Sequence, residues 1–438
     1  MTITRIAPSP TGKFHIGTAR TALINYIFAK QNSGQFLLRM EDTDQERNQA
    51  EYEEDIKNGL KWLRLDWDGE IIYQSQKTDR YLSIVDQLIK QNSAYQKDGA
   101  VWFKVPKNDT IKFNDLVRGK VEFKTDDLKD FVILRSDKSP IFYLTGVVDD
   151  NDAEITHIIR GEEHLSNTPK QILIIKALGW KLPIYAHLPL ILNSDRSKMS
   201  KRKDPVSISK DFKENGYLPE AMVNYLFLLG FHPKEKNPKS ETRNSKHNVD
   251  IYSLKEMFDI FDILRVQKGG AVFDIEKLKS INHFYLQQIP DTELFEKLKK
   301  YQGNVESDIF TRFISIIKPR LRYLEEINQE LGWLENPVVY PAEKLIFKKS
   351  DKTTTLKALN LVHTNLQKTA TPEVAEIGRV FKKIIENNSL SNGDVYWSTR
   401  VALSGLEKSP PPEELIWVLG KDKSLERIEK AINKLNSK

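Results

Sequence analysis

A short strand, a loop rich in proline and glycine, and a helix follow one another at the start of the chain, and this succession constrains the fold most. Ile3 to Ala7 is typical of a strand, and Pro8, Pro10 and Gly12 end it. Beyond the loop, apolar residues recur at helical spacings of three and four: Ile16, Ala19, Leu23, Ile24, Ile27 and Phe28. The first turn of such a helix offers unpaired N–H groups and the positive end of its dipole, which suits a nucleotide phosphate.

His15 and Gly17 lie at the mouth of that helix, and both are candidate site residues. Because Gly17 has no side chain, a phosphate or a base can approach the backbone closely there. A lone histidine at such a position is also common as a structural residue, so the motif by itself leaves a non-catalytic role open.

A second strand is predicted from Gln35 to Met40, and the polar run from Arg39 to Asp44 follows at its carboxyl end. Ligands of open α/β sheets bind at those strand ends. Glu41 is therefore placed to bind an ammonium group or to help order a metal–nucleotide complex. Its alternative role is a charge in the first turn of the next helix, which is predicted from about Glu53 to Leu63.

The middle of the chain predicts a β-rich insertion within an α/β pattern. The short strands expected there lie at residues 100–105, 120–123 and 131–136. If Pro140 to Leu144 forms a strand, Phe142 and Tyr143 point to opposite faces of it. The α/β pattern then resumes, with elements at residues 155–160, 168–178 and 184–188.

A polar loop after Leu192 holds a dense basic cluster. Lys198, Lys201, Arg202 and Lys203 place four cations within six residues, and these repel one another unless an anion lies near. Taken alone, a solvated surface loop is the simpler interpretation of this segment.

The chain beyond Pro219 is predicted to be mostly helical, and from about Asp291 to Lys438 helices follow one another almost without interruption. A polar, aperiodic stretch from Lys234 to Asn248 predicts an exposed loop. The helical tail is expected to be a separate all-α region made of two small bundles.

The composition narrows the possible classes. The chain has no cysteine, which excludes disulfides and thiolate zinc sites, and its eight histidines show no ligand-like pairing. Since it has no apolar run of about eighteen residues and no signal-like start, we expect a cytoplasmic protein without a membrane partner. The net charge of +6 permits a polyanionic partner without requiring one, and 438 residues favour several domains.

Two of these segments together resemble a known class of proteins. Pro8 to Thr18 is similar to the "HIGH" signature of class I aminoacyl-tRNA synthetases, and Lys198 to Arg202 is similar to their "KMSKS" signature. Both occur in the expected order on an α/β domain split by an insertion. Within that class the chain resembles the bacterial glutamyl-tRNA synthetases through segments spread over its length: residues 5–12, 19–23, 39–44, 158–164, 216–221, 400–405 and 418–421.

This resemblance implies an α/β fold with a Rossmann-like parallel-sheet catalytic domain, a β-rich insertion and an all-α anticodon-binding region. The implied catalytic domain consists of two halves, residues 1–76 and 141–205. Between them lies the connective insertion that binds the acceptor stem, residues 77–140. The stem-contact domain (206–290) and the anticodon-binding region (291–438) follow. The implied partners are tRNA(Glu), L-glutamate and ATP with Mg²⁺, and the implied state is a monomer.

The implied reaction has two steps. The α-carboxylate of glutamate attacks the α-phosphorus of Mg-ATP, and the terminal ribose hydroxyl of the tRNA then takes the glutamyl group. Positioning and stabilisation of phosphate charge suffice for both steps, so no side-chain nucleophile is required. The resemblance assigns catalysis to His15, Gly17, Lys198 and Lys201, the two lysines lying on a loop that closes over the triphosphate. It assigns ATP binding to the same residues and to Ser9, Glu163 and Ile191.

A glutamate pocket needs two buried cations and one anion, because glutamate carries two carboxylates and one ammonium group. The resemblance assigns to it Arg5, Ala7, Ser9, Glu41, Phe142, Gly146 and Arg160. Arginine's planar fork suits a carboxylate, although a structural ion pair is the alternative role, and which arginine meets which carboxylate stays open. The family usually has tyrosine at Phe142, so one hydrogen bond worth about 1 kcal/mol is lost. No zinc is expected in the insertion.

Other functions compete with this one. A non-catalytic RNA-binding relative would have lost the adenylate-binding residues, which are intact here, and a nucleotidylyltransferase acting on a small molecule would not need the helical tail. A glutaminyl-tRNA synthetase, or a glutamyl enzyme that also charges tRNA(Gln), stays open because the sequence does not locate the anticodon contacts.

Overall fold

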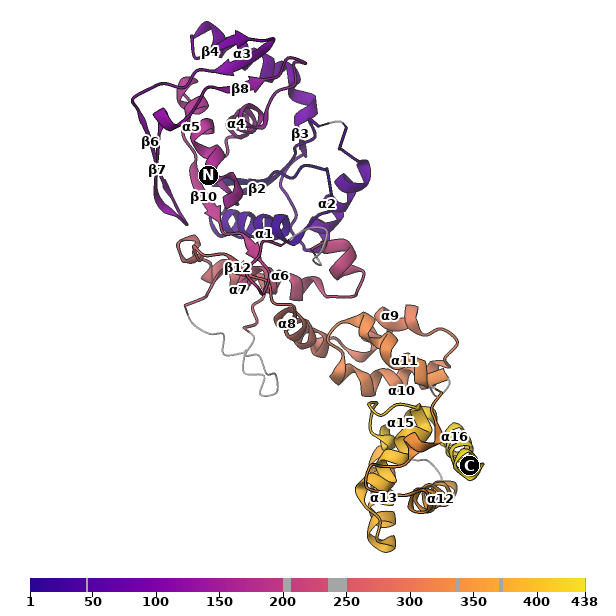
Figure 1. Ribbon diagram of the computed structural model, residues 1–438. Coiled ribbons are helices and arrows are strands. Elements are labelled where there is room, and N and C mark those ends of the chain that lie inside the picture. Colours follow the sequence, from indigo (N-terminus) through magenta and orange to yellow (C-terminus); the bar gives the residue numbers. More distant parts are fainter. Residues whose placement is uncertain (45, 200–205, 235–249, 336–338, 370–372, 438) are drawn as a thin grey trace. The chain divides into compact units, whose positions relative to one another are not determined.

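The computed structural model describes residues 1–44, 46–199, 206–234, 250–335, 339–369 and 373–437. The chain divides into two compact units, Met1–Asn282 and His283–Lys438 (Figure 1). Among the described residues, no helix is both long enough and apolar enough to cross a lipid bilayer.

The first unit is built on parallel strands. Its two parallel groups consist of β1 (Ile3–Ile6), β2 (Gln35–Met40) and β3 (Ile72–Tyr73), and of β9 (His157–Gly161) and β10 (Ile184–Leu188). The backbone N–H of Thr156 donates to the carbonyl of Ile3 at 3.0 Å, which joins the two groups side by side. The predicted α/β fold with a parallel sheet is confirmed.

Helix α1 (Ile16–Gln31) connects β1 to β2 and is buried on several sides. Its apolar residues pack as predicted, and buried polar groups fix the helix to the strands. The Asn25 amide donates to the carbonyl of Ile159 at 2.9 Å, and the Thr4 hydroxyl donates to the carbonyl of Asn25 at 3.0 Å. The middle of α1 is therefore held against β1 and β9.

The insertion contributes strands to two different sheets. Its elements are α3 (Thr78–Lys90), β4 (Ala94–Lys97), β5 (Ala100–Phe103), β6 (Thr110–Asp115), β7 (Gly119–Lys124) and β8 (Phe131–Leu134). β4, β5 and β8 form an antiparallel sheet, whereas the hairpin β6–β7 extends the sheet of β10, where Asp115 pairs with Tyr185. The three predicted strands are present, and β4 and β6 are additional to the prediction, although the alternation in β6 is a strand signal.

The segment from Pro140 to Leu144 does not form the strand considered in the sequence analysis, because helix α4 (Phe142–Asp152) begins there. Ile141 is extended, with φ −96° and ψ 149°, and caps the helix. A short apolar run fits a buried helix as well as a buried strand, so the sequence of this segment does not distinguish the two. Phe142 and Tyr143 are therefore about 100° apart around a helix rather than on opposite faces of a sheet.

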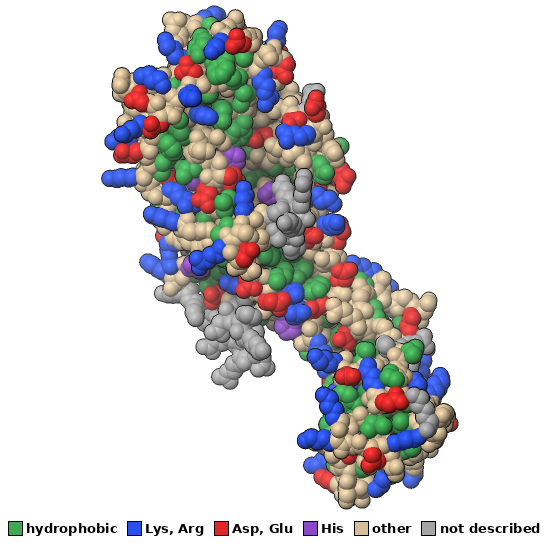
Figure 2. Space-filling model, in the orientation of Figure 1, with side chains coloured by type: hydrophobic (Ala, Val, Ile, Leu, Met, Phe, Trp, Pro, Cys, Tyr) green, Lys and Arg blue, Asp and Glu red, His purple; other side chains and the backbone are tan. Residues whose placement is uncertain are grey.

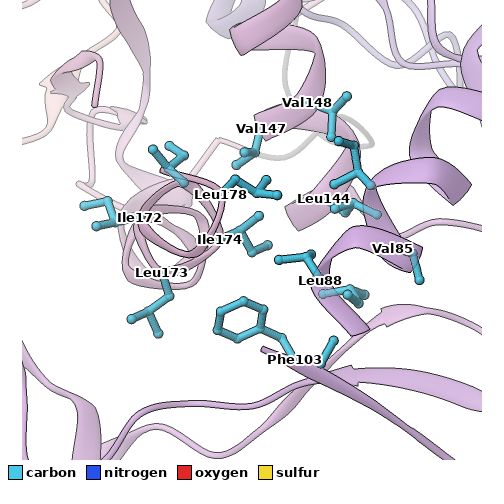
Figure 3. Close-up of a cluster of buried hydrophobic side chains, with 14 of the residues drawn as sticks. Val85, Leu88, Phe103, Leu144, Val147, Val148, Ile172, Leu173, Ile174 and Leu178 are labelled. Atoms are coloured by element: carbon cyan, nitrogen blue, oxygen red, sulfur yellow. The ribbon is translucent and has the colours of Figure 1, made fainter. Parts of the chain in front are cut away.

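One hydrophobic core joins the insertion to the parallel strands (Figure 3). In it, side chains of α3, α4, β5 and α5 (Thr168–Ala177) point toward one another. Leu88, Leu144 and Ile174 are completely buried. Since burying one such side chain contributes about 1.5–3 kcal/mol, the insertion is fixed firmly to the parallel-strand half.

Further elements complete the first unit. They are α2 (Ala50–Trp62), β11 (Ile191–Leu192), α6 (Pro219–Leu228), α7 (Leu254–Ile260), β12 (Ala271–Val272) and α8 (Ile275–Gln288), which continues into the second unit. β11 and β12 pair in parallel, so the segment after β10 is tied to the chain near residue 271. The exposed loop predicted from Lys234 to Asn248 lies outside the described residues, apart from Lys234 itself.

Every described element that begins in the second unit is helical, which confirms the predicted all-α region. Its α-helices are α9 (Asp291–Leu298), α10 (Ser307–Ile317), α11 (Ile327–Glu335), α12 (Lys352–Lys368), α13 (Val374–Asn388), α14 (Ser398–Ser404), α15 (Pro412–Leu419) and α16 (Lys421–Asn436). The buried guanidinium of Arg427 on α16 donates to carbonyls at 2.6–3.2 Å, those of Trp333, Leu334, Glu335 and Leu403. One side chain thereby satisfies open carbonyls near the ends of α11 and α14.

Lys and Arg side chains lie interspersed with Asp and Glu over the face shown in Figure 2, rather than gathered in one patch. The chain has 67 basic and 61 acidic residues, so the excess of positive charge is small. The charge of this face therefore identifies no partner by itself.

Candidate active site

A cavity of about 490 Å³ lies at the carboxyl ends of β1, β2 and β9, and its size suits a small-molecule site. It is lined by all the predicted site residues that the structure describes: Arg5, Ala7, Ser9, His15, Gly17, Glu41, Phe142, Gly146, Arg160, Glu163, Ile191 and Lys198. Lys201 lies outside the described residues. His15 and Lys198, far apart in the sequence, therefore border the same space, as a shared nucleotide site requires.

The basic loop is anchored on both sides, at strand β11 before it and beside the start of α1 after it. After the loop, the carbonyl of Val206 accepts from the N–H of Ile16 at 2.9 Å. The N–H of Ile208 then donates to the carbonyl of Phe14 at 2.9 Å. Before the loop, Lys198 forms a β-bridge with strand β11. These contacts hold Lys198 at the edge of the cavity.

His15 is the N-cap of α1 and closes the first turn of that helix. Its Nδ1 accepts from the N–H of Thr18 at 3.4 Å, and its Nε2 lies 3.1 Å from the Thr18 hydroxyl. A Cβ atom on Gly17 would lie 3.1 Å from the ring, so glycine lets the imidazole pack closely over the backbone. The turn borders the cavity at a place where N–H groups stabilise phosphate oxygens.

A buried network of charged side chains forms one wall of the cavity. Asp150 accepts from Nε of Arg5 at 2.9 Å and from Nη1 of Arg39 at 2.5 Å, and Nη2 of Arg39 reaches Glu41 at 3.1 Å. Burial would raise the pKa of Asp150, but its two guanidinium partners outweigh burial and lower that pKa to about 2. Burial also raises the pKa of Glu41, and Arg39 opposes this shift.

These contacts define the role of Arg5 in the structure. The sequence left two roles open for it, binding of a substrate carboxylate and a structural ion pair. Arg5 forms an ion pair with Asp150, whose side chain it shares with Arg39. The two guanidinium groups are balanced by Asp150 and Glu41, and Asp149 lies 3.8 Å from Nε of Arg39. A substrate that meets Arg5 therefore meets a cation whose charge is already partly compensated.

Arg160 differs from Arg5 because its hydrogen-bond partners are uncharged. Its Nη2 donates to the Thr168 hydroxyl at 2.9 Å, and its Nε donates to Nε2 of His187 at 3.3 Å. Among the described residues, no carboxylate forms an ion pair with it. Arg160 is 7% exposed, and burial lowers its pKa to about 10. A buried cation without a direct counter-charge attracts an anion strongly.

Uncharged side chains line the cavity near Arg160. The ring of Phe142 lies 5.3 Å from that of His164, whose pKa is lowered to about 4 by burial and by the charge of Arg160. A Cβ atom on Gly146 would lie 3.4 Å from the amide nitrogen of Gln171, so glycine leaves space beside this amide. Because these groups are neutral at pH 7, they do not compete with a ligand for the charge of Arg160.

Residues that the sequence analysis did not assign to the site complete the cavity: Arg20, Arg39, Asp150, His164 and Gln171. Arg39 precedes Glu41 by two positions along β2, and strand alternation places such residues on one face, so this signal was available. Asp150 lies in the last turn of α4, and its contact with Arg5 spans 145 positions. No local sequence pattern predicts that contact.

Comparison with known proteins first defines the class. The family described as "tRNA synthetases class I (E and Q), catalytic domain" matches residues 1–101 and 96–280, and the family described as "Anticodon binding domain" matches residues 293–432. The two matches cover most of the chain. The fold and the cavity therefore belong to a class I tRNA synthetase of the glutamate and glutamine group.

Full-length relatives then define the family. The glutamate–tRNA ligase of Lawsonia intracellularis is 37% identical over 98% of each chain, and that of Aquifex aeolicus is 37% identical over 99% of each. The crystal structure of a glutamate tRNA ligase from Elizabethkingia meningosepticum, in complex with its amino acid, matches 99% of each chain with a TM-score of 0.84 at 28% identity. The chain belongs to the glutamate–tRNA ligase family.

Proposed function

We propose that this protein activates L-glutamate with ATP and transfers it to the 3′ end of tRNA(Glu). The observation that carries the proposal is one cavity that brings His15 and Lys198 together with the buried cation of Arg160, which forms no direct ion pair with a carboxylate among the described residues. His15 and Lys198 suit a nucleotide, and Arg160 suits a carboxylate. Their presence in one cavity fits a reaction that joins an amino acid to a nucleotide.

The charges of the cavity fit glutamate. Arg160 is the stronger carboxylate site, because its contacts are neutral, and Arg5 takes the other carboxylate with Asp150 behind it. We assign the ammonium group to Glu41, which lines the same cavity. The other residues assigned to the amino acid are Ala7, Ser9, Phe142 and Gly146.

The first step joins glutamate to the nucleotide. The α-carboxylate oxygen of glutamate attacks the α-phosphorus of ATP, a mixed anhydride forms and pyrophosphate leaves. Mg²⁺ enters with ATP as part of the substrate. His15 and the first turn of α1 stabilise the charge that develops on the phosphate oxygens, and Lys198 neutralises the departing pyrophosphate. The residues assigned to ATP are Ser9, His15, Gly17, Glu163, Ile191 and Lys198, together with Lys201, which lies outside the described residues.

The second step moves the glutamyl group to the tRNA. The terminal ribose hydroxyl attacks the carbonyl carbon of the anhydride, and AMP leaves. We assign the acceptor stem to the insertion at residues 77–140, further stem contacts to residues 206–290, and the anticodon to residues 291–438. The match of residues 293–432 to an anticodon-binding domain supports the last assignment.

A charging assay tests this function. Purified protein, ATP and either radiolabelled glutamate or radiolabelled glutamine are combined with tRNA(Glu) or tRNA(Gln). Glutamate on tRNA(Glu) is the expected product, and glutamate on both tRNAs would define an enzyme of relaxed tRNA specificity. Charging with glutamine alone would overturn the proposal in favour of a glutaminyl enzyme. That the protein acts as a monomer in the cytoplasm stays a prediction, and light scattering tests the monomer.

A further inference from the structure

Three buried side chains lie behind Arg160 and connect it to the hairpin β6–β7. Asp115 ends β6, His187 lies on β10 and Thr168 begins α5. They are 1%, 0% and 0% exposed. Of the four residues, Arg160 alone borders the cavity. The contacts of His187 and Thr168 with Arg160 are therefore a direct route by which these buried residues can influence a ligand.

The contacts determine which nitrogen of His187 carries its proton. Oδ2 of Asp115 lies 2.6 Å from Nδ1 of His187, and since a carboxylate can only accept, Nδ1 is the donor. Burial lowers the pKa of His187, which keeps the ring neutral. Nε2 therefore has a lone pair. It faces Nε of Arg160 at 3.3 Å and the Thr168 hydroxyl at 3.0 Å.

We propose that Asp115 and His187 are positioning residues that hold Arg160 without placing a carboxylate in direct contact with it, and so set the preference of the pocket for a carboxylate over an amide. The proposal rests on the proposed function, in which Arg160 meets a carboxylate of glutamate. A carboxylate in direct contact with Arg160 would orient it equally well but would cancel its charge. The neutral imidazole orients the guanidinium and keeps the Asp115 charge on the far side of the ring.

The second oxygen of Asp115 has a separate, structural task. Oδ1 accepts from the backbone N–H groups of Val117 at 2.9 Å, Arg118 at 2.8 Å and His187 at 3.2 Å. These bonds require an oxygen but not a charge. An asparagine can therefore keep them with its amide oxygen while it presents an NH₂ group to Nδ1 of His187.

Asp115→Asn is the central test, because it reverses the tautomer of His187 with little change of shape. An NH₂ group opposite Nδ1 moves the ring proton to Nε2, which then opposes the N–H of Arg160. We expect the KM for glutamate in tRNA charging to rise about 10- to 100-fold. The KM for ATP should be unchanged, and the preference for glutamate over glutamine should fall by a similar factor.

Thr125→Val is the matched control on the same hairpin. Thr125 is buried, and its hydroxyl exchanges hydrogen bonds of 2.9–3.0 Å with the backbone of Asp109, remote from His187. We expect wild-type KM values for this variant. If it raised the KM for glutamate as much as Asp115→Asn does, or if Asp115→Asn raised both KM values equally, the hairpin would have only a structural role and the proposal would be overturned.

A second pair of variants keeps the proposal testable if Asp115→Asn does not fold. His187→Gln retains an acceptor for Arg160, and His187→Leu removes it. The KM for glutamate should rise more for His187→Leu than for His187→Gln. Equal KM values in the two variants would contradict the need for an acceptor.

Nitrogen-15 NMR of protein labelled at histidine reads the tautomer without any activity assay. The His187 signal, assigned by its loss in His187→Gln, should report a proton on Nδ1 in the wild type and on Nε2 in Asp115→Asn. A wild-type proton on Nε2 would overturn the proposal. If the wild type charged no glutamate at all, the proposed function would fail, whereas the tautomer measurement would still stand on its own.

Discussion

The variant Arg160→Gln is expected to weaken glutamate binding without destabilising the fold. Because no carboxylate pairs with Arg160 in the described part of the chain, removing its charge leaves no buried anion without a partner. The Thr168 hydroxyl and Nε2 of His187 can both bond to the glutamine amide. The change therefore removes mainly the attraction for a ligand carboxylate.

The expected size follows from the burial of the group. Truncating one partner of a desolvated charge pair costs about 2–5 kcal/mol. At about 1.4 kcal/mol for each factor of ten, the KM for glutamate should rise between about 30-fold and several thousand-fold. The KM for ATP should not change, because Arg160 is not among the residues assigned to ATP.

Arg5→Gln is the matched comparison. It leaves Asp150 with Arg39 as its remaining cation, and breaking a buried ion pair costs about 3–5 kcal/mol, with the lower end expected here since Arg39 stays. The midpoint of urea unfolding should therefore fall for Arg5→Gln and stay near the wild-type value for Arg160→Gln. Equal destabilisation by the two variants, or equal rises in KM for glutamate and ATP with Arg160→Gln, would refute this reasoning.

Four further outcomes are expected. Phe142→Tyr restores the hydroxyl that the resemblance predicts, and should lower the KM for glutamate by about fivefold, the equivalent of about 1 kcal/mol; an unchanged KM would show that the hydroxyl finds no partner. Arg427→Met leaves backbone carbonyls in the helical unit without donors, so its free energy of unfolding in urea should fall by about 3 kcal/mol. Asp150 has a pKa of about 2, below the ordinary value of about 3.9. It therefore contributes stability that is present above about pH 4 and is lost as the pH falls toward 2, and Asp150→Asn should remove this part of the pH dependence in unfolding midpoints measured from pH 5 to 2. Lys201→Ala should reduce tRNA charging by orders of magnitude with tRNA affinity nearly intact, and unchanged turnover would exclude the loop from the mechanism.

The regions that sequence reasoning predicts well are those with a local signal. The strand, loop and helix around His15 follow from Pro, Gly and apolar spacing, and the structure reproduces them from Ile3–Ile6 to Ile16–Gln31. The sequence does not determine the secondary structure at the start of α4. The apolar run at Phe142 is short, and such a run is compatible with either a buried strand or a buried helix. Even so, Phe142 lines the cavity as expected.

The sequence by itself determined the class of fold, the family and the identity of the residues that gather at the strand ends, because these depend on periodicity, turn residues and motifs that are local. Only the tertiary structure decided which arginine is paired directly with a carboxylate and which is held by uncharged groups. Arg5 is paired with Asp150, 145 positions away, and Arg160 is held by the neutral ring of His187. Charge compensation in a buried site depends on distances between side chains brought together by folding, and sequence spacing does not encode those distances.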